Sequence, residues 1–277
     1  MNYERTPGNQ RRRTRRDVLR IGAAGLLAAG FGTAAEAADE FHFLVVNDVH
    51  YVDEHCGRWL EGVVRRMNAH PEKPEFCLIA GDLAENGQRA QLAGVRDVVH
   101  GLGMPVYVVI GNHDYLVQDD RKAYDDLFPG RTNYAFEHRG WHILGLDTSE
   151  GQHYMNTSIQ LHTFRFLEET LPKLDRKRPC LVFTHFPLGP DVLMRPKNAD
   201  DLLARFRAHR VPAVFGGHFH GYTERKLGET TFTTDKCCSL RRENHDGTKE
   251  KGYFLCRAKD GKVRHTFIEV PVPPHPA

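Results

Sequence analysis

AVFGGHFH, residues 213–220, joins a short apolar run to two glycines and two histidines. The run has the length and composition of a buried strand, and side chains two positions apart on an extended chain point the same way. His218 and His220 are therefore expected to present both imidazoles to one side. The glycine pair would let the backbone come close to whatever lies there, because glycine has no side chain. By itself, such a histidine pair is equally typical of a polar turn.

Four other segments have the same form, an apolar run that ends in carboxylate, amide or imidazole side chains. In chain order they are Phe41–Val46 followed by Asn47-Asp48-Val49-His50, Phe76–Ala80 followed by Gly81-Asp82, Pro105–Ile110 followed by Gly111-Asn112-His113-Asp114, and Cys180–Phe183 followed by Thr184-His185. Runs this short and this apolar predict strands that are buried on both faces.

The segments between these runs favour helices: Arg58–Ala69, Gln88–Leu102, Thr157–Leu174 and Asn198–His209. Thr157 and Gln160 have the spacing of a capping box, and Asn198 is a suitable N-cap. Alternating strands and helices predict right-handed crossovers and a largely parallel sheet. Ligands bind beyond the carboxyl ends of the strands in such sheets. We therefore expect all five polar endings to gather along one edge of the sheet.

Antiparallel strands are also expected. Residues 133–137 and 141–146 flank Arg139-Gly140, residues 252–257 and 262–270 flank Asp260-Gly261, and residues 231–234 form a further apolar and β-branched run. Both dipeptides are typical of hairpin turns. The sequence thus predicts an α/β protein built as a mixed β-sandwich flanked by helices. Its 277 residues, 40% of them hydrophobic, allow a sizeable core.

The N-terminal residues predict an export signal rather than folded structure. An arginine-rich start is followed by a Gly- and Ala-rich apolar segment, residues 21–35, and by the small-residue motif Ala35-Glu36-Ala37. Arg15-Arg16 is similar to the twin-arginine signal that sends folded proteins across a bacterial inner membrane. We expect residues 1–37 to be a twin-arginine-type signal peptide, disordered or cleaved, and residues 38–277 to form a single domain.

The expected location is therefore periplasmic or secreted, with residues 14–37 recognised by the twin-arginine translocation machinery. The apolar segment is too short for a stable membrane anchor after cleavage, although an uncleaved anchor or a basic tail stays an alternative. Residues 1–37 carry a net charge of +4 while the whole chain carries +2, which leaves −2 for residues 38–277. This balance has no basic excess, so we expect no nucleic-acid partner.

The six cysteines form no obvious disulfide framework. Cys77 and Cys180 lie within apolar runs, where a thiol behaves as a small hydrophobic group. A bond between one of the adjacent pair Cys237-Cys238 and Cys56 or Cys256 stays open, because spacing alone does not specify pairing.

The polar endings together form a metal-ligand set of carboxylates, amide and imidazoles without a thiolate: Asp48, His50, Asp82, Asn112, His113, Asp114, His185, His218 and His220. Such a set suits Mn, Fe, Co or Zn better than Ca or Mg. One ion would not use so many ligands, so we predict two ions that share the carboxylate of Asp82. Asp82 alone would fit a turn and His185 alone would fit a packed core histidine, but the five endings together favour metal.

In this order, the five endings resemble the calcineurin-like metallophosphoesterase family over residues 48–220. The resemblance implies a four-layer α-β-β-α fold and a dinuclear centre of divalent or trivalent Fe, Mn, Zn or Co. It implies that Asp48, His50, Asp82 and His220 hold one ion and that Asp82, Asn112, His185 and His218 hold the other. A hydroxide activated by both metals would attack a small phosphoester. His113 would act as general acid, with Asp114 as its orienting partner.

Glu85 argues against one branch of this family, the purple acid phosphatases, because they have a tyrosine at that position. Residues 81–87, GDLAENG, are similar to the small bacterial branch that includes class III cyclic-nucleotide phosphodiesterases. We expect an exported phosphomonoesterase or phosphodiesterase. The alternatives are a cyclic-nucleotide phosphodiesterase of the cyclic AMP type and a family nuclease. Rivals from other classes are a non-catalytic metal-binding protein and a mononuclear amide hydrolase.

Substrate contacts are expected from three loops, residues 115–130, 187–197 and 223–246, and from four side chains, Tyr51, Arg195, Arg241 and Arg242. Asp147 ends an expected strand, where it would either face the cleft or cap a turn.

Overall fold

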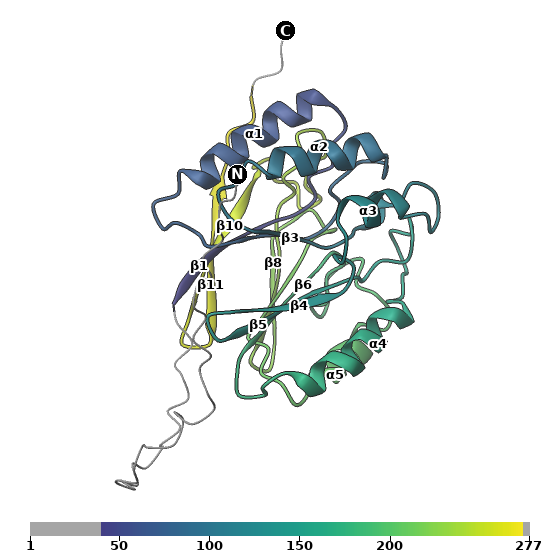
Figure 1. Cartoon of the computed structure of the whole chain (residues 1–277), viewed down its shortest axis with the longest axis vertical. Coiled ribbons are helices and arrows are strands. Elements are labelled where there is room, and N and C mark those ends of the chain that lie inside the picture. The colour runs from purple at the N-terminus through teal and green to yellow at the C-terminus, as the bar shows by residue number, and fades with distance from the viewer. Residues whose placement is uncertain (1–39, 274–277) are drawn as a thin grey trace, which may run out of the picture. The chain divides into compact units, whose positions relative to one another are not determined.

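The computed structural model describes residues 40–273 of the chain (Figure 1). The expected signal peptide, residues 1–37, lies outside the described residues. Between residues 40 and 273, no helix combines the length and the apolar character that crossing a membrane would require.

Two mixed sheets carry the fold. The first has the strand order β11-β10-β1-β2-β3, with β1 at Phe41–Val46, β2 at Cys77–Ile79, β3 at Val106–Val108, β10 at Gly252–Lys259 and β11 at Lys262–Glu269. Strands β1, β2 and β3 are parallel, and β10 and β11 are the predicted hairpin. Asp260 and Gly261 at its turn both have positive φ, as such a two-residue turn requires.

The second sheet has the order β4-β5-β6-β7-β9-β8, with β4 at Tyr134–His138, β5 at Trp141–Leu146, β6 at Cys180–Thr184, β7 at Ala213–Gly216, β8 at Thr223–Leu227 and β9 at Thr230–Thr234. Its four central strands are parallel, and the edge strands β4 and β8 are antiparallel to their neighbours. Strand β8 falls in a segment expected to be a loop. Its residues, TERKL, are largely exposed on a sheet edge, so no apolar alternation marks it.

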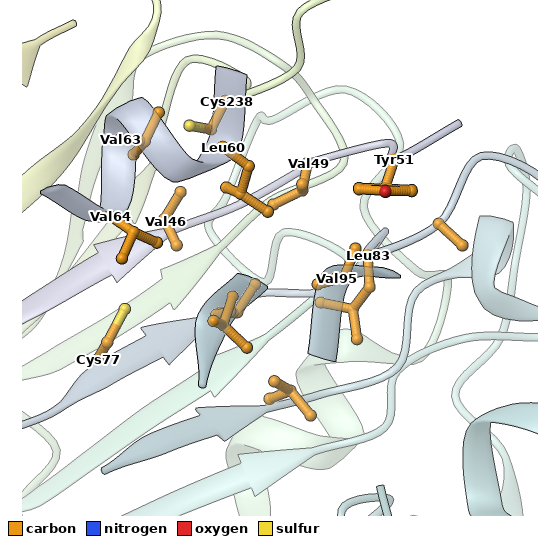
Figure 2. Packing of buried hydrophobic residues seen from close by; sticks show 14 of the residues in the cluster. Val46, Val49, Tyr51, Leu60, Val63, Val64, Cys77, Leu83, Val95 and Cys238 are labelled. Carbon is orange, nitrogen blue, oxygen red and sulfur yellow. The ribbon is translucent and has the colours of Figure 1, made fainter. Parts of the chain in front are cut away.

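Helices cover the outer faces of both sheets (Figure 1). Helices α1, Glu54–Asn68, and α2, Arg89–Val99, pack on the first sheet, where Val46, Leu60 and Val95 share a buried cluster (Figure 2). Helices α4, Leu161–Thr170, and α5, Ala199–Arg205, pack on the second sheet. A third cluster, which includes Phe43 and Phe183, fills the space between the sheets. The predicted four-layer α-β-β-α arrangement is confirmed.

Shorter helices complete the chain: η1 at Asn112–Asp114, α3 at Lys122–Leu127 and η2 at Leu171–Lys173. Helix α1 begins before its expected start at Arg58, because Asp53 caps it by accepting hydrogen bonds from the backbone of His55 and Cys56. Helix α4 begins only at Leu161, so the predicted capping box of Thr157 and Gln160 is wrong.

Asn198 precedes α5 but does not cap it through its side chain. Its amide instead accepts from the backbone N–H of Ile159 at 2.8 Å and donates to the carbonyl of the same residue at 3.0 Å. An asparagine side chain can pair with a neighbouring backbone in this way instead of capping a helix.

The polar endings do not lie along one sheet. Three follow strands β1, β2 and β3 of the first sheet, and two follow β6 and β7 of the second. Both sheets bring the carboxyl ends of these strands to the same place. The expectation of a single collecting edge is therefore wrong, because apolar periodicity identifies strands but not the sheet to which each strand belongs.

Candidate metal centre

Unusual backbone angles place most of the predicted ligands. Asp48, His50, Asp82, His218 and His220 have φ values of 53°, 47°, 50°, 64° and 47°, in the left-handed region. For residues other than glycine this conformation costs roughly 1 kcal/mol or more each, and it concentrates at functional sites. It turns each side chain out of the strand direction and toward the centre.

Four buried side chains form the first donor group, defined as Asp48, His50, Asp82 and His220. Nε2 of His50 lies 3.1 Å from Nε2 of His220 and 3.5 Å from Oδ2 of Asp82. Nε2 of His220 also lies 3.2 Å from Oδ1 of Asp48. One ligand atom from each residue lies within 4.8 Å of all the others.

The second donor group is Asp82, Asn112, His185 and His218, and His185 is its centre. Nε2 of His185 lies 3.3 Å from Oδ1 of Asp82, 3.1 Å from Oδ1 of Asn112 and 3.2 Å from Nδ1 of His218. The structure thus brings all seven predicted metal ligands together in the two predicted sets. Asp82 offers a different oxygen to each set, which suits a shared ligand.

Close packing at two glycines makes this approach possible. A Cβ atom on Gly111 would lie 2.2 Å from Oδ1 of Asp82, and one on Gly217 would lie 2.8 Å from Oδ2 of Asp48. The predicted close backbone approach at Gly217 is therefore present.

The ring nitrogens that face away from the donor groups contact backbone carbonyls. Nδ1 of His185 lies 2.9 Å from the oxygen of Ala80, Nε2 of His218 lies 2.9 Å from that of Tyr154, and Nδ1 of His220 lies 3.3 Å from that of Glu243. A carbonyl only accepts, so each of these histidines donates outward, and its other nitrogen faces inward, where it can bind a metal ion once any proton on it is displaced. Histidines that bind metals are held in this way. The chemistry of the donors and the facing imidazole nitrogens fit two transition-metal ions.

The electrostatics of the donor groups also favour cations. Burial alone would lower the pKa of His220, but the carboxylate of Asp48 outweighs burial and raises that pKa to about 11. Likewise, burial is outweighed at His185 by Asp82 and Asp48, which raise its pKa to about 9. Burial would raise the pKa of Asp48, but His220 and His185 lower it to about 2. Ionised carboxylates and two imidazolium groups therefore occupy the place where metal ions would bind.

His113 stands beside the first donor group rather than within it. Its backbone N–H donates to Oδ1 of Asp82 at 2.9 Å, and its Nδ1 lies 2.7 Å from the carbonyl oxygen of Glu85. Its ring centre is 4.7 Å from that of His50. This position suits the predicted role of a group that faces the substrate without being one of the seven ligands.

Asp114 does not orient His113, so that expectation is wrong. Its two oxygens accept from the backbone N–H groups of Ala84 at 2.9 Å and Gly111 at 2.8 Å. Of the contacts that the described residues make, none joins Asp114 to His113. Neighbouring residues on a helical turn point in different directions, and Asp114 points into the protein, where burial and Asp82 raise its pKa to about 8. Asp114 holds two loops together, and the carbonyl of Glu85 orients His113.

Glu85, which had no predicted role in the site, and Arg242, which was expected only as a substrate contact, lie behind the first donor group. An oxygen of Glu85 lies 3.1 Å from Nδ1 of His50, at ion-pair distance although not aligned as a hydrogen bond. Burial raises the pKa of Glu85, but His50 and Arg242 outweigh it and lower the pKa to about 2. The only sign of this role in the sequence is that Glu85 is a charged residue three positions after Asp82. Backbone contacts such as those of Tyr154 and Glu243 have no sequence signal.

Several residues singled out in the sequence lie away from the centre. Asp147 accepts from the backbone and hydroxyl of Ser149 and pairs with Arg121 and His162, so it caps a turn. Tyr51 lies with Leu83 and Val95 in the buried cluster under α1 and α2 (Figure 2).

Two of the arginines expected near the substrate make ion pairs elsewhere. Arg195 pairs with Asp200, and Arg241 pairs with Asp53. All six cysteines, which lie in the described part of the chain, are free and buried, so none of the pairings left open is formed there.

Comparison with known proteins agrees with this geometry. A family model described as Calcineurin-like phosphoesterase matches residues 41–222. A probable cyclic nucleotide phosphodiesterase of Rhodopseudomonas palustris is 28% identical over 211 residues, which cover 64% of this chain and 71% of that protein. A glycerophosphodiester phosphodiesterase of Enterobacter lignolyticus is 27% identical over 202 residues, 66% of this chain and 69% of its own length.

Solved structures show the likeness in fold. A purple acid phosphatase from yellow lupin aligns with a TM-score of 0.62 at 12% identity, over 83% of this chain and 52% of that one. The GAP50 anchor of the Plasmodium inner membrane complex aligns with a TM-score of 0.60 at 13% identity, over 83% of this chain and 84% of that one. At such low identity the likeness extends to the fold alone.

Proposed function

The chain belongs to the calcineurin-like phosphoesterase family of metal-dependent phosphoric ester hydrolases, and from this premise we propose that it hydrolyses small phosphodiesters with two bound metal ions. The position of Asp82 is the main support for two ions. Its Oδ2 lies 3.5 Å from Nε2 of His50, and its Oδ1 lies 3.3 Å from Nε2 of His185. One carboxylate therefore belongs to both donor groups.

The first donor group would hold one ion of Fe, Mn, Zn or Co, and the second would hold another. When bound, the two cations would neutralise charge on the phosphoryl group and supply hydroxide at neutral pH. Phosphoric esters hydrolyse extremely slowly in water, so this charge neutralisation is the main requirement for catalysis.

His113 supplies the proton for the leaving group. Its Nδ1 lies 2.7 Å from the carbonyl of Glu85 and must carry a proton, because a carbonyl only accepts. Nε2 remains for the substrate, and it donates only when the ring is an imidazolium. As the bond from phosphorus to the leaving oxygen breaks, Nε2 passes its proton to that oxygen and His113 becomes neutral. The reaction then yields an alcohol and a phosphomonoester.

Two relatives support a diester as substrate, since one is named for cyclic nucleotides and the other for glycerophosphodiesters. We infer a location outside the cytoplasm from the composition of residues 1–37, with export by the twin-arginine machinery. An exported enzyme would meet glycerophosphodiester-type compounds more readily than cytosolic cyclic AMP. Cyclic-nucleotide hydrolysis is the second candidate, favoured by the relative in Rhodopseudomonas palustris.

A substrate panel tests this function. The purified protein would be stripped of metal, reloaded with Mn, Fe, Zn or Co, and assayed with glycerophosphodiesters, cyclic nucleotides and matched phosphomonoesters. We expect two ions per chain and faster turnover of the acyclic diesters than of the monoesters. Binding of a single ion, or faster hydrolysis of monoesters, would overturn the proposal. Export is tested separately by replacing Arg15 and Arg16 with lysine and measuring the periplasmic fraction.

A further inference from the structure

Behind the first donor group lies a layer of contacts from a part of the chain beyond the family match, which ends at residue 222. The carbonyl of Glu243 lies 3.3 Å from Nδ1 of His220. The neighbouring Arg242 reaches Glu85, 157 positions away in the sequence. The loop that carries these two residues therefore contacts His220 directly and Glu85 through Arg242.

Glu85 connects this loop to two histidines with different roles. Its side-chain oxygen Oε2 lies 3.1 Å from Nδ1 of His50, one of the predicted ligands. Its backbone oxygen lies 2.7 Å from Nδ1 of His113, the predicted acid. Both contacts are to Nδ1, so Nε2 of each ring is left for the reaction site. A displacement of residue 85 would therefore disturb both rings.

Arg242 holds Glu85 with a two-pronged ion pair. Its Nε lies 3.0 Å from Oε2, and its Nη2 contacts Oε1. The paired geometry of a guanidinium and a carboxylate restricts rotation of both side chains. The backbone of Arg242 is itself held, since its N–H donates to Ser239 Oγ at 3.0 Å and its carbonyl accepts from Lys251 Nζ at 2.6 Å.

We propose that Glu85 and Arg242 form a positioning pair that aligns His50 for one metal ion and His113 for proton transfer. The carboxylate 3.1 Å behind His50 would act on the ring electrostatically, favouring the orientation that turns Nε2 toward the ion and increasing its basicity as a ligand. This inference rests on the proposed function, because it takes the two donor groups to be metal sites.

The pair serves the two donor groups unequally. Within residues 40–273, the outer nitrogens of His185 and His218 contact the carbonyls of Ala80 and Tyr154, and neither of those residues contacts the pair. Loss of the pair should therefore weaken the binding of the ion in the first donor group and leave the binding of the other ion unchanged. A general loosening of the fold would weaken both.

The experiment compares Arg242→Ala, Arg242→Lys and Glu85→Gln with Arg241→Ala. Arg241 is the matched control because it is adjacent, is similarly exposed and pairs with Asp53 instead. Stepwise Zn and Mn affinities would be measured with a competing chelator. Changes to groups behind metal ligands typically cost 10- to 100-fold in affinity. We expect a loss of that size, about 10- to 100-fold, in one binding step of Arg242→Ala and Glu85→Gln, a smaller loss in Arg242→Lys, and none in Arg241→Ala.

A kinetic measurement examines the contact with His113. At saturating metal, kcat would be compared for diesters with a nitrophenol leaving group, which needs little protonation, and an alcohol leaving group, which needs a full proton. Arg242→Ala releases residue 85, whose backbone carbonyl contacts His113, so it should lose at least about 10-fold more turnover with the alcohol than with the nitrophenol, a part of the 10²- to 10⁴-fold that general acid catalysis contributes. Equal losses with the two leaving groups would contradict the role of the pair at His113.

The inference is overturned if both binding steps are unchanged, if both weaken equally, or if Arg241→Ala has the same effect as Arg242→Ala. The proposed function fails in a different way, since the unaltered protein would then bind fewer than two ions or leave every phosphodiester intact.

Discussion

Oδ1 of Asp82 lies 3.3 Å from Nε2 of His185, and these two residues follow strands of different sheets. The contact joins the two halves of the sandwich at the carboxyl ends of their strands. Both side chains are fully buried, so the contact forms only when the sheets are packed together. The predicted metal centre is therefore also a link between the two layers.

Asp82→Asn should remove the shared negative charge and reduce metal binding from two ions to one or none. We expect kcat to fall by about 10²- to 10³-fold, the scale of losing one main electrostatic contribution to the transition state. Metal analysis and steady-state kinetics measure both effects. Asp147→Asn is the control, because Asp147 is as buried as Asp82 but contacts Arg121 and His162 instead. Loss of metal in the control alone would refute the shared-ligand role of Asp82.

His113→Ala should keep both metal ions and lose about 10²- to 10⁴-fold in kcat, because a general acid is removed while all seven predicted ligands remain. Metal content measured alongside turnover separates these effects. If the variant loses a metal ion, His113 is a ligand and not the acid. Asp114→Asn should lower the free energy of unfolding, because Asp114 holds two loops together, and should leave the dependence of kcat on the leaving group largely unchanged.

Gly111→Ala should damage the centre without altering any ligand. Its new Cβ would lie 2.2 Å from Oδ1 and 2.4 Å from the backbone nitrogen of Asp82. Overpacking of this kind typically costs about 1–3 kcal/mol in the free energy of unfolding, and here it would also displace the shared carboxylate. Chemical denaturation and metal analysis provide the measurements.

Gly62→Ala is the matched control for Gly111→Ala. Gly62 lies within α1, and a Cβ there would be 3.7 Å from its nearest neighbour. Replacing a helical glycine by alanine should raise stability by roughly 0.5–1 kcal/mol. Similar stability losses in both variants would contradict the steric argument.

Metal binding should compete with protons. His185 and His220 have pKa values raised from 6.5 to about 9 and about 11, so both are imidazolium groups at neutral pH in the metal-free protein. Metal ions must displace these protons, and apparent metal affinity should increase as the pH rises from 6 to 9. Calorimetric titrations in buffers with different protonation heats count the released protons. An affinity independent of pH in this range would contradict the prediction.

The same two histidines determine whether the stability of the metal-free protein rises or falls with pH. Because their folded pKa values are raised, the folded state binds more protons than the unfolded state between pH 6.5 and about 11. The stability from these two histidines is complete below pH 6.5 and is lost as the pH rises through about 9 and then about 11. Thermal melting of chelator-treated protein should show a midpoint that falls over this range, and an alkaline rise would contradict the assignment.

Most ligands of the centre could be predicted from the sequence, because the pattern that marks each of them lies within a short segment. Each ligand follows an apolar run within a few positions, and strand order along the chain predicts the carboxyl-end placement. The failed expectations concern direction and distance. Asp114 has the right spacing to assist His113 but turns into the protein. Near α4 and α5, Gln160 donates to the carbonyl of Ser158 and Asn198 pairs with the backbone of Ile159.

The amino-acid sequence by itself determined the identity and order of the seven ligand candidates and the alternation of strands and helices, since apolar periodicity and ligand chemistry are properties of short segments. Only the tertiary structure decided that the ligands come from two sheets and that Glu85 pairs with Arg242. It also decided that backbone carbonyls orient the histidines. These contacts join positions far apart in the chain, and a backbone carbonyl is the same at every residue, so neither leaves a pattern in the sequence.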